Sequence, residues 1–329
     1  MTSQQRIRGV LAPVLTPFDA QLAIDGARFI AHCRWLVAQG AGLAIFGTNS
    51  EAASISVPER LAVTEQLVAA GVPANRLMPG TGACALSDAV ELTRHATKIG
   101  AAGALMLPPF FFKGVSDDGL FAYYAEVIER VGSGCTPIYL YHIPQVSQVP
   151  ITLGLIERLL KRYPGVVAGA KDSSGDWANA KAMIDNFAES GFDVFPASES
   201  LMSRSMPIGG AGCISATANL NPGGIHALIQ GWNGPQAVQL QAQADTVRKI
   251  FQAAPMIPAM KYTVAHFAND PRWRTVRPPL VAMSDAAGRD LLAQLDATGF
   301  DMPAYPQGAV VATAPAGSGG DRSDLVPVE

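Results

Sequence analysis

Short apolar runs alternate with amphipathic segments from the N-terminus to about residue 230, and this alternation limits the folds open to the chain. Each of eight runs precedes a helix candidate, and near-continuous apolar strands alternating with helices are typical of a parallel sheet covered on both faces. Eight such units in one domain predict an α/β fold, a (β/α)8 TIM barrel with a C-terminal helical extension. An open doubly wound sheet with a helical appendage is the alternative. The predicted strands lie within 9–17, 42–48, 77–83, 103–109, 137–143, 166–174, 193–199 and 212–219.

Helix start and stop signals separate these runs. The segment 57–71 begins with Pro58 beside the first-turn Glu59 and ends at Gly71, which are ordinary signals for the two ends of a helix. Ser87 is predicted to cap the next helix.

After residue 219 the pattern contains helices only. We expect the barrel over residues 1–230, helices packed on the barrel over 231–305, and a disordered tail over 306–329, where the composition is that of a linker. The predicted C-terminal helices cover residues 234–254, 257–268 and 284–299.

Composition excludes several classes of function. The chain is 49% hydrophobic and 16% charged, its net charge is −3, and it has no basic block, so neither nucleic acid nor an anionic membrane is expected as a partner. Four well-separated cysteines form no CxxC pair, which argues against a zinc site or a disulfide framework. The most apolar stretch, 100–112, is broken by Pro108 and Pro109, and the N-terminus does not match a signal peptide. A cytoplasmic protein is therefore expected.

Lys171 ends the apolar run "VVAGAK", an uncommon place for a side chain that is seldom buried without a partner. In one interpretation it is a strand-end charge that reaches solvent or pairs with Asp172. In the other it is a nucleophile that forms an imine with a carbonyl compound. Apolar surroundings favour this chemistry because desolvation disfavours the ammonium form.

Tyr141 ends the preceding strand. It is either a core tyrosine with its hydroxyl at the rim or a proton shuttle for the lysine amine and its substrate. Adjacent strands lie about 4.8 Å apart, so Tyr141 and Lys171 are expected within reach of one substrate.

The segment "GTNSE" (47–51) offers the Thr48 hydroxyl, the Asn49 amide and successive backbone N–H groups at a strand-to-helix turn. Such turns bind small carboxylates, although an ordinary turn before the next helix explains the segment equally well. Neither "GTNSE" nor "GGAGCIS" (209–215) matches a nucleotide-binding loop. No pattern of metal ligands is present in the sequence. The histidines are scattered: His32, His95, His142, His226 and His266.

Taken in order, these motifs resemble those of the dihydrodipicolinate synthase and N-acetylneuraminate lyase superfamily of pyruvate-dependent class I aldolases. The resemblance runs from about residue 8 to about residue 300. "GTNSE" resembles the carboxylate loop GTTGE or GSTGE, and "YLYHIP" (139–144) resembles the strand Y-N-[IV]-P. "AGAKDSSG" (168–175) resembles the lysine strand G-[IV]-K-[ED]-x-[ST]-G, and "GGAGCISATAN" (209–219) resembles GG-x-G-x-IS-x-x-AN.

The resemblance implies that Lys171 forms a Schiff base with pyruvate or another 2-oxo acid and that Tyr141 relays protons. It implies that Thr48 and Asn49 hold the substrate carboxylate and that the Ile214 backbone lines the same pocket. Lys171, Tyr141 and Thr48 are thus the predicted catalytic residues, and Thr48, Asn49 and Ile214 the predicted substrate-binding residues. No metal and no cofactor beyond the imine are implied, and a homotetramer is expected.

The sequence departs from the family pattern at the second substrate. Val146 stands where the synthases have an arginine that binds a carboxylate, and "PPFFFKG" (108–114) contains no counterpart of their relay tyrosine. Ala197 replaces a glycine that the sugar acid lyases use, and Ser50 replaces a glycine of the carboxylate loop. A valine cannot replace the charged bidentate arginine, so we expect a less anionic second substrate. The three phenylalanines of "PPFFFKG" indicate a partly apolar or aromatic aldehyde.

The sequence therefore predicts a lyase or aldolase that cleaves or forms a C–C bond between pyruvate and an aldehyde. Three alternatives stay open: dihydrodipicolinate synthesis proper, dehydration of a deoxy sugar acid, and a binding or sensing protein for 2-oxo acids without turnover.

Overall fold

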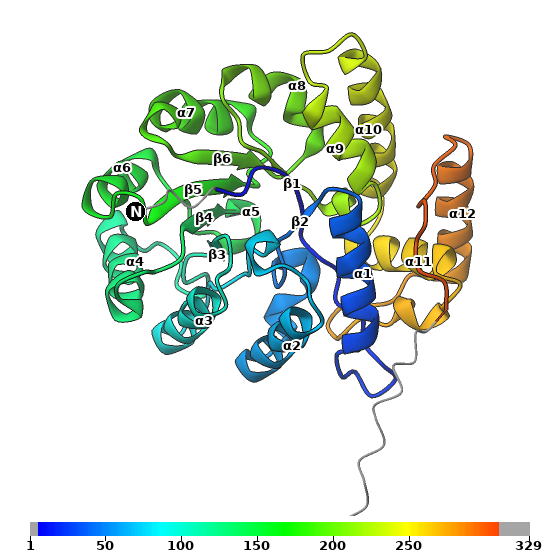
Figure 1. The fold of residues 1–329 in the computed structure, drawn as a ribbon, viewed down its shortest axis with the longest axis horizontal. Coiled ribbons are helices and arrows are strands. Elements are labelled where there is room, and N and C mark those ends of the chain that lie inside the picture. Colours follow the sequence, from blue (N-terminus) through cyan, green and yellow to red (C-terminus); the bar gives the residue numbers. More distant parts are fainter. Residues whose placement is uncertain (1–5, 309–329) are drawn as a thin grey trace, which may run out of the picture.

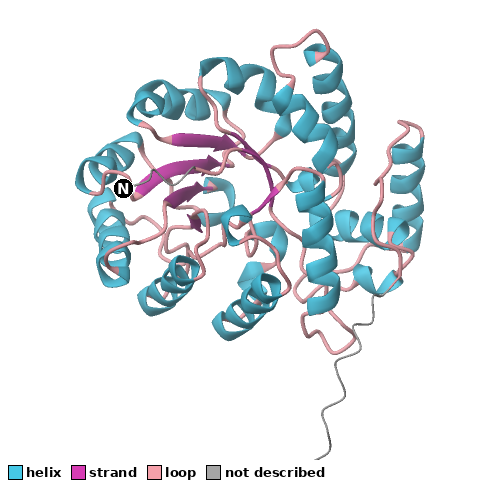
Figure 2. Ribbon diagram, in the orientation of Figure 1, coloured by secondary structure: helices cyan, strands magenta, loops and turns pink. Residues whose placement is uncertain are grey.

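The computed structural model describes residues 6–308, and parallel strands occupy its centre (Figures 1 and 2). Every strand is almost wholly buried, as expected for a parallel sheet with helices packed against its outer side. The strands are β1 (Gly9–Ala12), β2 (Gly42–Leu43), β3 (Ala104–Met106), β4 (Ile138–His142), β5 (Val167–Asp172), β6 (Asp193–Pro196) and β7 (Gly212–Ile214).

Two sheets, β2-β1-β7 and β3-β4-β5-β6, close into one barrel. The extended segment 77–80 joins β2 to β3, because Met78 donates to the Leu43 carbonyl and Leu105 donates to the Pro79 carbonyl, both at 2.8 Å. On the other side, the Ala211 N–H donates to the Val194 carbonyl at 3.0 Å and joins β7 to β6. The predicted (β/α)8 barrel is confirmed, with segment 77–80 as its eighth extended piece.

The third predicted strand, 77–83, differs from the other seven because it forms only isolated bridges. Pro79 lies in its centre and has no N–H to donate, so the ladder with the neighbouring strand is interrupted there.

Helices follow the strands around the outside of the barrel. The predicted start of the second helix is confirmed to within a residue, since Ser56 and Glu59 form a reciprocal cap at its N-terminus. The helices of the barrel are α1 (Gly26–Ala38), α2 (Val57–Ala69), α3 (Leu86–Lys98), α4 (Asp117–Val131), α5 (Pro144–Ser147), α6 (Leu153–Arg162), α7 (Trp177–Phe187), α8 (Met202–Ser205) and α9 (Pro222–Gln230).

The predicted Ser87 cap is wrong. Helix α3 begins at Leu86 with Ala85 in the capping position, so Ser87 already lies inside the first turn. Its hydroxyl donates to the neighbouring Asp88 carboxylate at 3.3 Å instead.

The three C-terminal helices form as predicted and lie on one side of the barrel, beyond α1 and α9 (Figure 1). Residues 306–308, placed in the tail by the sequence, are described, and the Gly308 N–H donates to the Ala268 carbonyl at 3.0 Å. The rest of the predicted tail, 309–329, lies outside the described residues. The helices are α10 (Ala237–Gln252), α11 (Met256–Phe267) and α12 (Asp285–Asp296).

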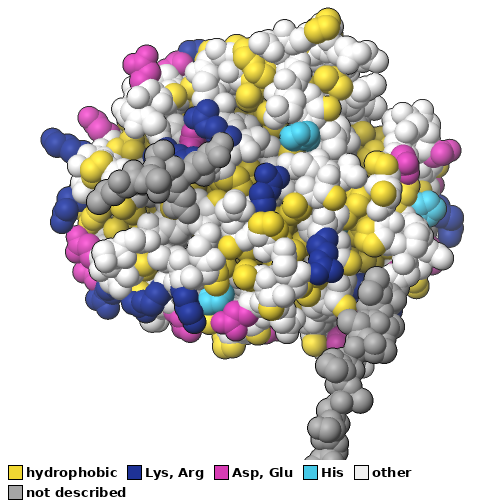
Figure 3. Space-filling model, in the orientation of Figure 1, with side chains coloured by type: hydrophobic (Ala, Val, Ile, Leu, Met, Phe, Trp, Pro, Cys, Tyr) yellow, Lys and Arg dark blue, Asp and Glu magenta, His cyan; other side chains and the backbone are white. Residues whose placement is uncertain are grey.

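None of the helices within residues 6–308 has the length and apolar character needed to cross a membrane. On the face of the molecule in Figure 3, basic side chains lie both at the edge and in the middle, acidic side chains lie mainly toward the edge, and apolar side chains lie between them.

Candidate active site

Lys171 and Tyr141 lie side by side near the carboxyl ends of two adjacent strands. They are paired residues in the register of β5 with β4, and the Lys171 Nζ donates to the Tyr141 Oη at 3.1 Å. Only 2% of Lys171 is exposed, and the amine also lies 4.2 Å from the centre of the Tyr141 ring. The structure thus rules out the solvent-exposed strand-end charge as a description of Lys171.

Small residues before Lys171 allow this part of the barrel to close tightly. A Cβ at Gly169 would come within 2.1 Å of the Asp193 carbonyl oxygen and 2.8 Å of the Tyr139 ring. Any side chain larger than hydrogen would push β5 away from β6, so the run "AGA" fits a barrel whose interior is filled by Tyr139. The packed interior fixes the strand that carries Lys171.

Thr48 continues the line of polar groups that begins at Lys171. Its Oγ1 lies 3.0 Å from the Tyr141 Oη, which gives a chain from amine to phenol to hydroxyl. Thr48 opens the short helix η1 (Thr48–Ser50), which also contains the half-buried Asn49. The first N–H groups of a helical turn have no partner within it, so those of Thr48 and Asn49 are oriented as donors at the barrel mouth.

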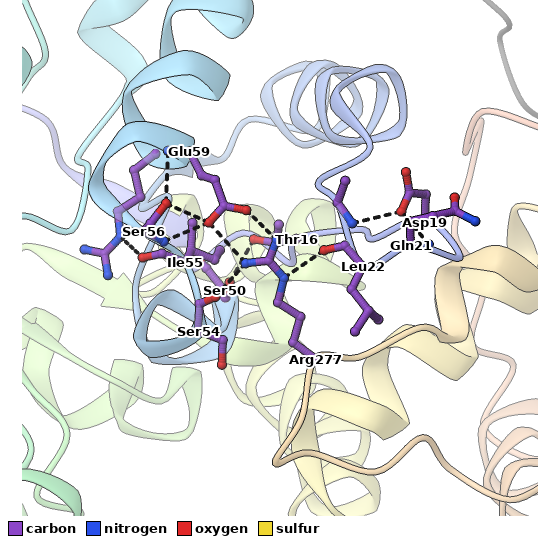
Figure 4. A network of polar contacts seen from close by, with 12 residues as sticks. Thr16, Asp19, Gln21, Leu22, Ser50, Ser54, Ile55, Ser56, Glu59 and Arg277 are labelled. Carbon is purple, nitrogen blue, oxygen red and sulfur yellow. Dashed lines mark hydrogen bonds and ion pairs between the residues drawn. The ribbon is translucent and has the colours of Figure 1, made fainter.

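Ser50, which replaces a family glycine, fits this loop without a positive φ. Its hydroxyl accepts from the Gly47 N–H at 3.2 Å. Its carbonyl accepts from the Thr16 hydroxyl at 2.8 Å, a contact shown in Figure 4. The substitution therefore tightens the loop and occupies one of its backbone amides.

The Tyr141 hydroxyl has an altered acidity. Burial alone would raise the pKa of Tyr141, but the charge of Lys171 and hydrogen bonds with Thr48, Lys171 and Ser173 outweigh burial and lower the pKa below its ordinary value. A phenol that releases its proton more readily is better suited to exchange protons with a neighbouring amine.

The other predicted residues lie close to this pair in the fold. Ile214 ends β7 and belongs to the same interior cluster of side chains as Tyr141. His142 follows Tyr141 and so points to the other side of the strand, where its Nδ1 accepts from the Ile151 N–H at 2.9 Å. Within residues 6–308, no group of three or more His, Cys, Asp or Glu side chains is arranged to hold a metal ion.

A second buried lysine, Lys261, was not predicted from the sequence. It comes from α11 and forms an ion pair with Glu51, the last residue of "GTNSE". The exposed fractions of the two side chains are 0% and 1%. Burial is the largest influence on Lys261 and lowers its pKa to about 8, while Glu51 acts in the opposite direction. The C-terminal extension therefore neutralises and holds the loop that carries Thr48.

Arg277 makes a second connection between the extension and the barrel mouth (Figure 4). Its side chain pairs with Glu59 and donates to the carbonyls of Ser54 and Leu22, while its backbone N–H donates to the Glu51 carboxylate at 3.0 Å. In the sequence these residues are visible only as charged side chains, and nothing indicates that they pair, because the partners lie more than 200 residues apart.

Glu199, which follows β6, is a further buried carboxylate that sequence reasoning did not single out. It accepts hydrogen bonds from the Ser215 and Thr217 hydroxyls after β7, and Arg248 lies 3.8 Å away. Its carboxylate is therefore already occupied by protein donors.

A cavity of about 600 Å³ opens beside Tyr141 and Thr48. Val146 and Phe110 line it, whereas Phe111 is 75% exposed and does not. The segment "PPFFFKG" thus contributes one of its three phenylalanines to the cavity wall. The volume suits a small organic ligand, for which protein pockets measure about 300–1,000 Å³.

Fold and site together define a (β/α)8-barrel protein with a buried amine and a hydroxyl relay at the carboxyl ends of its strands, where barrel enzymes hold their reactive groups. Residues 6–298 match the model of the dihydrodipicolinate synthetase family, and the chain belongs to this family. It is a lyase of that family.

The comparisons extend over nearly the whole described chain. An uncharacterized DapA-like lyase of Chloroflexus aurantiacus is 31% identical, over 84% of this chain and 92% of that protein. The crystal structure of dihydrodipicolinate synthase from Agrobacterium tumefaciens is similar with a TM-score of 0.81 and 32% identity, over 89% of this chain and 99% of that one.

YagE, a prophage protein of E. coli K12 solved in complex with pyruvate, has the same fold. The TM-score is 0.80 at 24% identity, over 90% of this chain and 99% of that one.

Proposed function

We propose that this protein is a Schiff-base aldolase, which forms or cleaves a C–C bond between pyruvate, or another 2-oxo acid, and an aldehyde. The observation that carries the proposal is the buried chain of hydrogen bonds from the Lys171 amine through the Tyr141 phenol to the Thr48 hydroxyl. A buried lysine whose partner is a neutral hydroxyl can supply a free amine after a single proton transfer.

Lys171 attacks the C2 carbonyl of the 2-oxo acid and forms a carbinolamine. Loss of water then gives an iminium ion, which withdraws electrons from C3 and acidifies its protons. Removal of one C3 proton yields an enamine whose C3 is nucleophilic. The covalent imine supplies the electron sink, so the reaction requires neither metal nor organic cofactor.

Tyr141 moves the protons of these steps. Its Oη lies 3.1 Å from the Lys171 amine, close enough to protonate the departing hydroxyl of the carbinolamine and later the aldehyde oxygen. Thr48, 3.0 Å from the same phenol, links it to the barrel mouth, where protons can exchange with water.

The 2-oxo acid carboxylate would be held by Thr48 and Asn49, whose backbone N–H groups open the helix η1. The ion pair between Glu51 and Lys261 supports this assignment, because it removes the free negative charge that would otherwise repel a carboxylate at this loop. The Ile214 backbone would line the same subsite from β7.

Two of the alternatives require side chains that this site lacks or that already bind other groups of the protein. Dihydrodipicolinate synthesis would require another group to bind the carboxylate that the synthases hold with arginine, since Val146 lies at that position in the cavity wall. A sugar acid would have to displace the Ser215 and Thr217 hydroxyls from Glu199. A sensor without turnover would keep the imine and fail only in catalysis.

Borohydride reduction in the presence of pyruvate tests the proposal directly. The full chain is incubated with pyruvate, reduced, digested and analysed by mass spectrometry, and the adduct is expected on the peptide with Lys171. Lys261 is the internal control, because it is equally buried but paired with Glu51. An adduct on Lys261, or none, contradicts the proposal, and an adduct without turnover of any aldehyde favours a sensor.

A homotetramer in the cytoplasm remains the expectation for the assembled protein. Its oligomeric state is measured by native mass spectrometry or light scattering of the full chain.

A further inference from the structure

The cavity is lined by Tyr141 and Thr48, and Tyr141 is the hydrogen-bond partner of Lys171; from there the cavity extends to the helices outside the barrel. Its wall near the strand ends is built from Leu105, Leu107 and Ile143, and Val146 and Phe110 continue it outward. Ile257 and Leu280 of the C-terminal extension complete it on the other side. Most of the surface around the space into which the enamine of a bound 2-oxo acid would face is thus apolar.

The charged side chains of this cavity already have protein partners. Glu51 is neutralised by Lys261, and Arg60 donates through its Nε to the Ile55 carbonyl at 3.1 Å and through its Nη2 to the Ala52 carbonyl. Asp88 accepts from the Ser87 hydroxyl at 3.3 Å, and both Arg60 and Asp88 belong to helices outside the ring of strands, α2 and α3. Val146 leaves the cavity wall without a cation at the position where the synthases hold a carboxylate.

We propose that the second substrate is an apolar aldehyde, aromatic or long-chain aliphatic, whose body fills the cavity between Phe110, Val146 and Leu280 while its carbonyl faces Tyr141. This inference rests on the proposed Schiff-base function and specifies its substrate class. A polyhydroxylated or carboxylated aldehyde would lose water at its polar groups without gaining hydrogen bonds from these side chains, whereas an apolar body gains from burial.

The bond-forming step follows from this placement. The enamine C3 donates its electron pair to the aldehyde carbon, and the π electrons of the aldehyde C=O move to its oxygen, which takes a proton from Tyr141. Water then hydrolyses the imine, which releases a 4-hydroxy-2-oxo acid and restores the Lys171 amine. The reverse sequence cleaves the same acid to pyruvate and the aldehyde.

A panel of aldehydes tests the substrate class with the unmodified protein. Benzaldehyde and hexanal are compared with glyceraldehyde and succinate semialdehyde, each with pyruvate, and kcat/KM is measured. We expect kcat/KM to be at least about tenfold higher for the apolar pair, since single apolar groups in such pockets discriminate about 10–200-fold. Equal or higher values for the polar pair overturn the inference, as does failure to turn over either apolar aldehyde.

Two neighbouring residues provide a matched pair of variants. Leu280→Ala removes part of the cavity wall, and kcat/KM for benzaldehyde is expected to fall about tenfold. Val281→Ala changes the adjacent side chain, which is 79% exposed and does not line the cavity, and is expected to leave kcat/KM unchanged. A similar loss in both variants, or in neither, contradicts the assignment.

Borohydride trapping with pyruvate separates failure of this inference from failure of the proposed function. Trapping on Lys171 involves no aldehyde, so it is expected in the native protein and in both variants. A normal adduct together with a preference for polar aldehydes overturns the apolar substrate alone, whereas the absence of an adduct overturns the Schiff-base function and this inference together.

Discussion

Lys171 and Tyr141 are register partners on neighbouring parallel strands, and their polar atoms are 3.1 Å apart. Their relative position is therefore set by the backbone hydrogen bonds between β4 and β5. A reacting amine and its proton carrier held in this way need little reorganisation before each transfer.

Removal of the Lys171 amine is expected to abolish turnover. Lys171→Ala leaves no group that can form the imine, and loss of a covalent nucleophile lowers kcat on the order of 10⁴–10⁶-fold. Pyruvate release from a 4-hydroxy-2-oxo acid measures the effect, and a circular dichroism spectrum checks the fold. Turnover by Lys171→Ala within tenfold of the native rate would exclude the imine mechanism.

Tyr141→Phe is expected to lower kcat/KM by about 10²–10⁴-fold, because it removes the proton relay but keeps the ring against Lys171. Tyr139→Phe is the matched control. Tyr139 lies two residues earlier on the same face of β4, and its buried hydroxyl has no hydrogen-bond partner among the described residues. Steady-state kinetics give kcat/KM for both variants. An equal loss of kcat/KM in the two would show that the phenol of Tyr141 acts only in packing.

Lys261→Met is expected to destabilise the fold by about 3–5 kcal/mol, since removing one member of a buried ion pair leaves the other charge uncompensated. The double variant Lys261→Met with Glu51→Gln removes both charges and is expected to recover a large part of this loss. Urea unfolding gives the free energies. A double variant less stable than Lys261→Met alone would contradict the assignment of the loss to the unpaired Glu51.

The Glu59–Arg277 pair predicts a dependence of stability on pH. The hydrogen bond with Arg277 is the largest influence on Glu59 and lowers its pKa from 4.5 to about 2. Because the folded pKa is the lower one, the contribution of Glu59 to the free energy of unfolding is present above about pH 4.5 and is lost as the pH falls toward 2.

Glu59→Gln should therefore be less stable than the native protein near neutral pH, and the difference should shrink as the pH falls below about 4.5. Since the side chain is 36% exposed, solvent screening limits the expected difference to about 1 kcal/mol. Urea unfolding measures it at both ends of this range. Asp118→Asn, at the exposed pair with Arg158, is the control and is expected to show no comparable change. A difference that grows on acidification would contradict the linkage.

The sequence predicted those features that depend on local pattern. Seven apolar runs form strands, the three C-terminal helices form, and the ends of the strands bring Thr48, Tyr141 and Lys171 together. These results follow from periodicity and from the geometry of parallel barrels, both of which are readable within short windows.

The features that the sequence did not predict depend on contacts between residues far apart in the chain, or on the exact residue at which a helix begins. In the sequence, Lys261 is one charged residue of an amphipathic helix. Only the folded chain shows that it forms an ion pair with Glu51, which lies more than 200 residues earlier in the sequence. The Ser87 cap failed because the start of a helix shifted by one or two residues, which is the least predictable part of an element. The shape of the cavity likewise depends on Ile257 and Leu280, which reach it from the C-terminal extension.

The ion pair between Glu51 and Lys261 joins two parts of the chain that leave the ribosome at different times during synthesis. A nascent chain that has emerged only as far as β7 already contains Thr48, Tyr141 and Lys171, yet it lacks the cation that neutralises the Glu51 carboxylate. The charge of Glu51 at the barrel mouth is neutralised only after α11 has left the ribosome. All the reactive residues are therefore synthesised well before the active site that contains them can be completed.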